Sequence, residues 1–342
     1  MSSARRREPG SVMLDVAGLE LERADADRIA HPACGGVILF ARNVGSPRQV
    51  AELVAAIREA RGGPLPICID QEGGRVQRLR TGFTQVPAMG AIGRLYDCDA
   101  RAGREAARAA GSVIGRELRA LDLDFSFTPV LDLDWGRSAV IGDRAFHGDP
   151  GTAALLAGDL LDGLAAWGVA GIGKHFPGHG YAGDDSHVAI PTDERPLEQI
   201  IAADVEPYAR LCDRMAGVMP AHVIYPQADP HPAGFSRFWL QTVLRQRLGF
   251  SGAILSDDLA MEGASVAGSI RARAQAALEA GCDVALICNR PDLADELLDA
   301  GLPDPAPESR ARILALCARP VARSPGDDVD WLQARAALEP AR

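Results

Sequence analysis

The segment Gly36-Val-Ile-Leu-Phe40 and the helical pattern that follows it decide the fold class. The segment is a short apolar run without polar alternation, which is typical of a strand buried on both faces of a parallel sheet. After it, Ser46-Pro47 is a helix-start signal, because proline fits the first position of a helix. This signal opens Arg48–Arg61, where apolar residues recur on one helical face. A buried strand followed by such a helix is the repeating unit of α/β folds.

The same unit recurs along the chain. The candidate strands are Val12–Asp15, Gly36–Phe40, Ile67–Asp70, Phe125–Pro129, Ala170–Lys174, Val218–Ala221, Ala253–Ser256 and Val284–Cys288. The main helical segments are Arg48–Arg61, Asp99–Ala120, Gly151–Trp167, Pro196–Arg214, Arg237–Leu248 and Ile270–Ala280. Eight strands alternating with helices predict an α/β fold, a single-domain (β/α)8 barrel of the TIM type. A doubly wound open sheet is the alternative, but no Gly-x-Gly-x-x-Gly follows the first strand.

We expect residues 1–300 to form the barrel and residues 301–342 to form a C-terminal helical extension packed on it. The 342 residues are 47% hydrophobic and 24% charged, which is typical of a packed globular protein. The net charge of −10 argues against nucleic acid and anionic membranes as partners. No apolar run approaches the ~20 residues that a membrane-spanning helix needs. No obligate protein partner is predicted.

The N-terminal residues and the cysteines favour a reducing, cytoplasmic location. An arginine cluster at Arg5–Arg7 is not followed by an apolar core of ~7–15 residues, so no secretory signal is expected. The seven cysteines are scattered, without any Cys-x-x-Cys spacing. This pattern predicts reduced, mostly buried thiols and argues against a thiolate metal site.

Charged and titratable residues follow four of the predicted strands, at the end of a barrel where catalytic groups collect. These residues are Asp70, Lys174, His175, His222, Asp257 and Asp258. One aspartate at a strand-to-helix turn would be interpreted as a helix cap. Several that converge on one rim indicate a functional site. Four of the seven histidines, His175, His179, His187 and His222, also fall in these regions.

Lys174 stands out because the other 35 of the 36 basic residues are arginines. A general preference for arginine could spare one lysine by chance. A site that needs a compact ammonium instead of a planar guanidinium would also retain it. Its place directly after Ala170-Gly-Ile-Gly173 favours an ammonium that points into the mouth of the barrel.

The segment Pro177–Pro191 is a glycine-containing loop that carries Asp185-Ser-His187. A carboxylate two residues before an imidazole can hold one ring nitrogen, fix the tautomer and favour the charged ring. The pair is a candidate general acid/base that moves over a bound substrate. The alternative is an exposed, solvated acidic loop. An ionised Asp257 facing such a protonatable group would suit glycoside hydrolysis.

The motifs together resemble a known family. Asp70-Gln-Glu-Gly-Gly-Arg-Val-Gln-Arg78, Lys174-His-Phe-Pro-Gly-His-Gly180, Asp185-Ser-His187 and Ser256-Asp-Asp-Leu259 resemble, in this order, glycoside hydrolase family 3. More narrowly, they resemble the bacterial cytoplasmic β-N-acetylhexosaminidases of peptidoglycan recycling. The resemblance runs from about Val12 to Pro291.

The resemblance implies a retaining double displacement. In it Asp257 is the nucleophile, His187 is the proton donor and acceptor, and Asp185 orients His187. The implied substrate-binding residues are Asp70, Arg78, Arg144, Lys174 and His175. No metal or organic cofactor is implied. The implied substrate is a small molecule with a terminal β-linked N-acetylglucosamine (GlcNAc), mainly GlcNAc joined to 1,6-anhydro-N-acetylmuramic acid (anhydroMurNAc), with or without a stem peptide. The resemblance further implies that the released anhydro-muropeptides can induce β-lactamase.

Other functions remain compatible with the residues. Lys174 could be the Schiff-base lysine of a class I aldolase. A metal-dependent hydrolase could use His175, His179, His187 and Asp185, although these lack metal-binding helical spacing. A sugar-binding barrel used as a sensor would leave the Asp185–His187 pair unexplained. In a substrate-assisted variant, the acetamido oxygen of the substrate would attack in place of Asp257.

Overall fold

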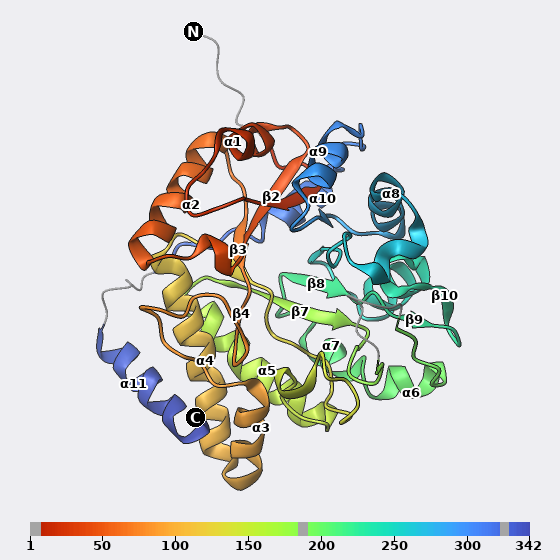
Figure 1. The fold of residues 1–342 in the computed structure, drawn as a ribbon. Coiled ribbons are helices and arrows are strands. Elements are labelled where there is room, and N and C mark those ends of the chain that lie inside the picture. Colours follow the sequence, from red (N-terminus) through yellow and green to blue (C-terminus); the bar gives the residue numbers. More distant parts are fainter. Residues whose placement is uncertain (1–7, 184–190, 322–327) are drawn as a thin grey trace.

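The computed structural model describes residues 8–183, 191–321 and 328–342, and within them eight parallel strands form a barrel (Figure 1). The strands are β1 (Val12–Asp15), β2 (Cys34–Leu39), β3 (Ile67–Ile69), β6 (Phe125–Ser126), β7 (Ala170–Phe176), β8 (Gly217–Pro220), β11 (Ala253–Ile254) and β12 (Ala285–Leu286). They pair in chain order, and β12 also pairs with β1. A parallel bridge between Leu255 and Val284 joins β11 to β12 and closes the barrel. The predicted (β/α)8 fold is therefore confirmed.

Helices surround the sheet on the outside (Figure 1). They are α1 (Arg23–Ala30), α2 (Pro47–Arg61), α3 (Met89–Cys98), α4 (Ala100–Ala120), α5 (Pro150–Ala165), α6 (Leu197–Ala202), α7 (Glu206–Leu211), α8 (Ile270–Ala280) and α9 (Pro291–Asp299). Short 3₁₀ turns are η1 (Ala41–Asn43), η2 (Gly142–Arg144), η3 (Ala233–Phe235), η5 (Glu262–Ala267) and η6 (Glu339–Ala341). Among these α-helices, α1, α3 and α9 were not predicted from the sequence patterns.

Helix α2 shows how the sequence sets the boundaries of an element. The Ser46 hydroxyl accepts a hydrogen bond from the Gln49 N–H at 3.2 Å, and Pro47 occupies the first turn. The helix ends at Gly62, whose φ of 63° lies in the left-handed region that glycine adopts without a steric penalty. Its apolar face, formed by Val50, Leu53, Val54 and Ile57, is buried against the barrel.

Two predicted helices differ in the structure. The segment Pro196–Arg214 forms two helices, α6 and α7, because the chain turns at Asp204. The buried Asp204 carboxylate accepts a hydrogen bond from the Trp135 indole and pairs with Arg195, which holds the turn. The segment Arg237–Leu248 contains a π-helix (η4, Phe238–Arg247). A hydrophobic pattern over ten residues does not distinguish that wider turn from an α-helix.

Two hairpins, which follow strands β3 and β8, were also not predicted, and the first of them carries site residues. Strands β4 (Gln71–Gly73) and β5 (Val76–Gln77) pair antiparallel directly after β3. Gly73 has a φ of 103°, and a Cβ there would lie 2.5 Å from the Pro87 carbonyl oxygen. Only glycine therefore fits this turn. The second hairpin pairs β9 (Ile224–Tyr225) with β10 (Asp229–Pro232).

The C-terminal segment forms α10 (Pro307–Leu314) and α11 (Asp328–Leu338), and α11 lies alongside α4 (Figure 1). The Arg116 guanidinium stacks 4.5 Å above the Trp331 ring at this contact. The predicted boundary at residue 300 stays a prediction.

Within the described ranges, no helix combines the length and apolar character needed to cross a bilayer. All seven cysteines lie in these ranges, are unpaired, and four of them are buried.

Candidate active site

A cavity of about 450 Å³ opens at the carboxyl ends of the barrel strands. Six of the eight predicted site residues line it, namely Asp70, Arg78, Arg144, Lys174, His175 and Asp257. The other two, Asp185 and His187, lie outside the described residues. Gly183, the last described residue before them, lines the same cavity.

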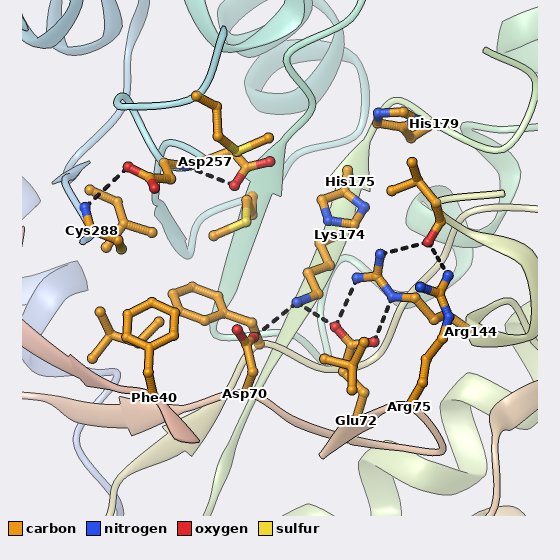
Figure 2. A pocket seen from close by; sticks show the side chains of 18 of the residues that line it. Phe40, Asp70, Glu72, Arg75, Arg144, Lys174, His175, His179, Asp257 and Cys288 are labelled. Carbon is orange, nitrogen blue, oxygen red and sulfur yellow. Dashed lines mark hydrogen bonds and ion pairs between the residues drawn. The ribbon is translucent and has the colours of Figure 1, made fainter. Parts of the chain in front are cut away.

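Lys174 is the centre of a buried ion-pair network on one side of the cavity (Figure 2). Its ammonium nitrogen lies 3.2 Å from Asp70 Oδ1 and 2.6 Å from Glu72 Oε1. Burial opposes the charged form, but these two carboxylates outweigh it and raise the pKa of Lys174 above its usual value. An ammonium has three N–H donors, so one remains for a ligand in the cavity.

Glu72 extends this network to Arg144 (Figure 2). The Arg144 Nε and Nη2 donate to the two carboxylate oxygens of Glu72 at 2.8 and 2.9 Å. Glu72 is 2% exposed, and burial alone would raise its pKa. Lys174 and Arg144 instead hold the pKa of this carboxyl well below its usual range. The bidentate pair fixes the guanidinium, because its planar fork matches a carboxylate.

Two further arginines of the β4–β5 hairpin border the cavity. Arg78 Nη2 lies 3.6 Å from Asp70 Oδ2, and among the described residues its Nε has no hydrogen-bond partner. Arg75 donates to the Ala139 carbonyl at 3.0 Å and pairs with Asp143 at 3.3 Å. Arg75 therefore ties the hairpin to the segment before Arg144, whereas Arg78 has donor capacity left for a ligand.

His175 is oriented by Asp132. The imidazole Nδ1 lies 2.7 Å from Asp132 Oδ2, and the backbone N–H of His179 donates to Asp132 Oδ1 at 2.7 Å. Burial would raise the pKa of Asp132, but the two histidines outweigh it and lower that pKa. An ionised Asp132 only accepts, so Nδ1 carries the proton and Nε2 is left for a ligand.

Asp257 lies across the cavity from Lys174 (Figure 2). Its Oδ1 accepts a hydrogen bond from the Asp258 N–H at 2.8 Å. Burial opposes ionisation, but nearby His222 and His175 outweigh it and hold the pKa of Asp257 below its usual value. The residue is therefore a carboxylate at neutral pH, which is the form required of a nucleophile.

The adjacent Asp258 has the opposite tendency. Burial raises its pKa to about 7, although the N–H groups of Ala260 and Cys288 donate to Oδ1 at 2.9 and 3.1 Å. The neighbouring charges of Asp257 and Asp15 raise it further. At neutral pH, two consecutive aspartates are thus separated into an ionised carboxyl and one that is about half protonated.

This separation predicts a pH-dependent stability. An aspartate in the unfolded chain titrates near ~3.9, so between that pH and about 7 the folded state holds a proton that the unfolded chain releases. This group's contribution to the free energy of unfolding therefore falls as the pH rises from about 4 to 7. Asp258→Asn removes this effect. We expect the Tm of the variant minus that of the wild type to rise by roughly 2–8 °C between pH 4.5 and 8. A constant difference in calorimetric scans across this range would contradict the assignment.

Sequence reasoning missed three residues that organise the site. Glu72 lies within the first quoted motif, and its place two residues after Asp70 was the available signal. Asp132 ends an apolar run after β6, as Asp70 and Asp257 end theirs, and could have been found by the same rule. His222 was noted but not assigned. It is fully buried, and its Nε2 lies 3.1 Å from the Asp258 carbonyl oxygen.

The arrangement suits a neutral polyol ligand. Hydrogen-bonding groups gather on one side of the cavity, and the ionised carboxylate of Asp257 lies on the other (Figure 2). Lys174 is protonated and ion-paired, which disfavours its use as the neutral amine of a Schiff-base aldolase. The site can thus bind hydroxyl groups and present a nucleophile to a carbon held between them.

Comparisons with known proteins agree with this chemistry. The family model "Glycosyl hydrolase family 3 N terminal domain" matches residues 10–315. A β-hexosaminidase from Aromatoleum aromaticum is 59% identical over 321 residues, covering 93% of this chain and 90% of that protein. A β-hexosaminidase from Bordetella avium is 52% identical over 348 residues, covering 100% and 97%.

A solved structure supports the same relationship. NagZ from Neisseria gonorrhoeae, in complex with N-trifluoroacetyl-D-glucosamine, superposes with a TM-score of 0.93 at 45% identity, covering 98% of this chain and 99% of that one. The resemblance indicated by the sequence motifs is confirmed. The chain therefore belongs to glycosyl hydrolase family 3, where it groups with the bacterial β-hexosaminidases, and it is a glycoside hydrolase.

Proposed function

We propose that the protein is a retaining exo-β-N-acetylglucosaminidase that releases terminal, non-reducing β-linked GlcNAc. Its main substrate would be GlcNAc-anhydroMurNAc, with or without the stem peptide, in the recycling of peptidoglycan. The observation that carries the proposal is the ionised Asp257 facing the network of Lys174 across one cavity. The relative solved with an N-acylated glucosamine supports the class of sugar.

The sugar would be held by the charged network. The free N–H of Lys174 and the remaining donors of Arg78 and Arg144 would donate to sugar hydroxyl oxygens. Asp70 would accept a hydrogen bond from one sugar hydroxyl, and the unprotonated Nε2 of His175 would accept one from a second hydroxyl. Because Glu72 and Asp132 fix these groups beforehand, little order has to be gained when the sugar binds.

In the first chemical step, an Asp257 oxygen would attack the anomeric carbon as the bond to the leaving oxygen breaks. His187, oriented by Asp185, would give its proton to that oxygen. The product is a covalent glycosyl-aspartate. In the second step, His187 would take a proton from water, and the resulting hydroxide would displace Asp257 and release GlcNAc with a β-configuration. Asp185 and His187 lie outside the described residues, but Gly183, four residues before His187, lines the cavity. Four residues span at most about 14 Å, so the Cα atom of His187 would lie within that distance of Gly183 on the cavity wall.

The proposal also covers where the protein acts in the cell and what its loss would change. A cytoplasmic location fits seven unpaired cysteines in the described chain. The acidic net charge fits a small-molecule substrate, with neither nucleic acid nor membrane as a partner. If the products are anhydro-muropeptides that induce β-lactamase, loss of the enzyme would also lower antibiotic resistance. No cofactor is needed, because the two steps balance with water alone.

The experiment compares two substrates in wild type and His187→Ala. The leaving group of GlcNAc-anhydroMurNAc is a sugar alkoxide, which departs poorly unless it is protonated. The leaving group of 4-nitrophenyl N-acetyl-β-D-glucosaminide is 4-nitrophenolate, which departs without protonation. We expect wild type to hydrolyse both. His187→Ala should lose about 10²–10⁴-fold in kcat/KM on the disaccharide but about 10-fold or less on the nitrophenyl glycoside.

The outcomes separate the two parts of the proposal. Equal losses on both substrates would remove His187 from the proton-donor role. A wild type that cleaves the nitrophenyl glycoside but not the disaccharide would overturn the proposed substrate and leave the chemistry standing. The release of GlcNAc can be followed for both substrates by the same chromatographic assay.

A further inference from the structure

Asp258 joins four groups of the active-site floor. Its N–H donates to Asp257 Oδ1 at 2.8 Å, and its carbonyl oxygen lies 3.1 Å from His222 Nε2. Its own Oδ1 accepts from the N–H groups of Ala260 at 2.9 Å and Cys288 at 3.1 Å. The backbone of Asp258 is therefore bonded to Asp257 and to His222, which follows β8, and its side chain is bonded to Cys288, which follows β12.

We propose that Asp258 is a positioning residue, which holds Asp257 so that its second oxygen, Oδ2, is the atom that attacks the sugar. This inference rests on the proposed function, in which Asp257 is the nucleophile. Among the described residues, the Asp258 N–H is the donor to the Asp257 carboxylate. Because Oδ1 is engaged, the two oxygens of Asp257 are not equivalent, and the rotation of that carboxylate is restricted.

The hydrogen bond from the Cys288 N–H shows that Asp258 does more than form a local turn. An aspartate that accepts from the N–H two residues ahead, as Asp258 does from Ala260, forms a common Asx turn. Cys288, in contrast, lies 30 residues away, after β12. The bond therefore crosses the seam at which β11 and β12 close the barrel, where Leu255 and Val284 form an isolated bridge.

His222 supports the same peptide from the interior. A carbonyl oxygen only accepts, so His222 Nε2 carries the proton and donates to Asp258. The ring is fully buried and stacks on Phe235, with centroids 5.6 Å apart and an angle of 29° between the planes. Burial lowers the pKa of His222 from its usual value, although the nearby carboxylate of Asp257 opposes this shift. The ring thus restrains Asp258 through a hydrogen bond and through its packing in the interior.

The proposal predicts a difference between two substitutions. In Asp258→Asn, the amide oxygen still accepts from Ala260 and Cys288, so the backbone should keep its place. Asp258→Ala removes both bonds and leaves two N–H groups without their partner. A shift of about 1 Å in the reacting atoms can cost ~10²-fold in rate. We therefore expect only Asp258→Ala to slow the chemical step while leaving sugar binding nearly unchanged.

The test measures the rate constant for labelling of Asp257 by a fluorinated GlcNAc donor, the inhibition constant of GlcNAc, and the Tm. For Asp258→Ala we expect labelling to slow about 10–100-fold, with the inhibition constant changed less than about threefold. Asp258→Asn should restore most of the labelling rate. A matched control is Asp124→Ala at the opposite end of the barrel, where this buried carboxylate accepts from Ile67 N–H at 2.7 Å and Ala318 N–H at 2.9 Å. It should lower the Tm without slowing labelling.

Three results would overturn the inference. These are wild-type labelling in Asp258→Ala, labelling in Asp258→Asn that is as slow as in Asp258→Ala, or a loss of GlcNAc binding equal to the loss of rate. Failure of the proposed function has a different signature, because wild type itself would then carry no label on Asp257.

Discussion

Asp257→Asn is expected to lower kcat on 4-nitrophenyl N-acetyl-β-D-glucosaminide by about 10⁴-fold or more, with little change in the Tm. Asparagine keeps the shape and still accepts the 2.8 Å hydrogen bond from the Asp258 N–H. It lacks the negative charge that, in the proposed mechanism, attacks the anomeric carbon and stabilises the positive charge developing there. Removal of a nucleophile costs far more than removal of a binding contact, because no other group takes over the bond.

Two comparisons make this prediction specific. Asp258→Asn, one residue along, should keep most of the turnover, because its carboxyl acts through hydrogen bonds that an amide oxygen can also accept. Asp124→Ala, at the far end of the barrel, should change stability alone. If Asp258→Asn were inactive and Asp257→Asn active, the assignment of the nucleophile would be wrong by one residue.

Lys174→Met is expected to lower kcat/KM by about 10²–10³-fold and the Tm by roughly 10 °C. The substitution removes a proposed donor to the sugar, worth ~1.5–3 kcal/mol for a charged hydrogen bond, and releases the position of Asp70. It also leaves the buried Glu72 with Arg144 as its remaining partner. Breaking a buried pair costs about 3–5 kcal/mol, which for a domain of this size is several degrees.

A double variant separates stability from activity. Lys174→Met combined with Glu72→Gln removes the uncompensated charge, and the amide oxygen can still accept from Arg144. We expect this variant to regain part of the Tm but none of the activity. If activity returned with stability, Lys174 would be a structural counter-ion and not a sugar ligand. Lys174→Arg should remain inactive, because a planar guanidinium does not fit the space of a compact ammonium.

The fold could be predicted from the sequence because its signals are local. Each barrel strand is a short apolar run such as Ile67–Ile69, and many helices start at a capping residue such as Ser46. The break at Asp204 was not predictable in this way. It depends on Trp135 and Arg195, which reach that residue from other parts of the chain.

The site was predictable to the extent that strand ends converge in a barrel. Asp70, Lys174 and Asp257 lie together because parallel strands place their carboxyl ends on one rim. The sequence could not show that Glu72 holds both Lys174 and Arg144, because that contact depends on how the β4–β5 hairpin folds back over the cavity. The different protonation of Asp257 and Asp258 was equally hidden, since burial and the neighbouring histidines decide it.

The most direct test of the mechanism is mass spectrometry of the enzyme treated with a fluorinated GlcNAc donor that slows hydrolysis of the intermediate. A covalent glycosyl-aspartate predicts a mass increase of one fluorosugar on the peptide that contains Asp257, and its loss as activity returns. An active enzyme that never carries the label, or carries it on another residue, would contradict the account. In the first case, attack by the acetamido oxygen of the substrate would replace attack by Asp257.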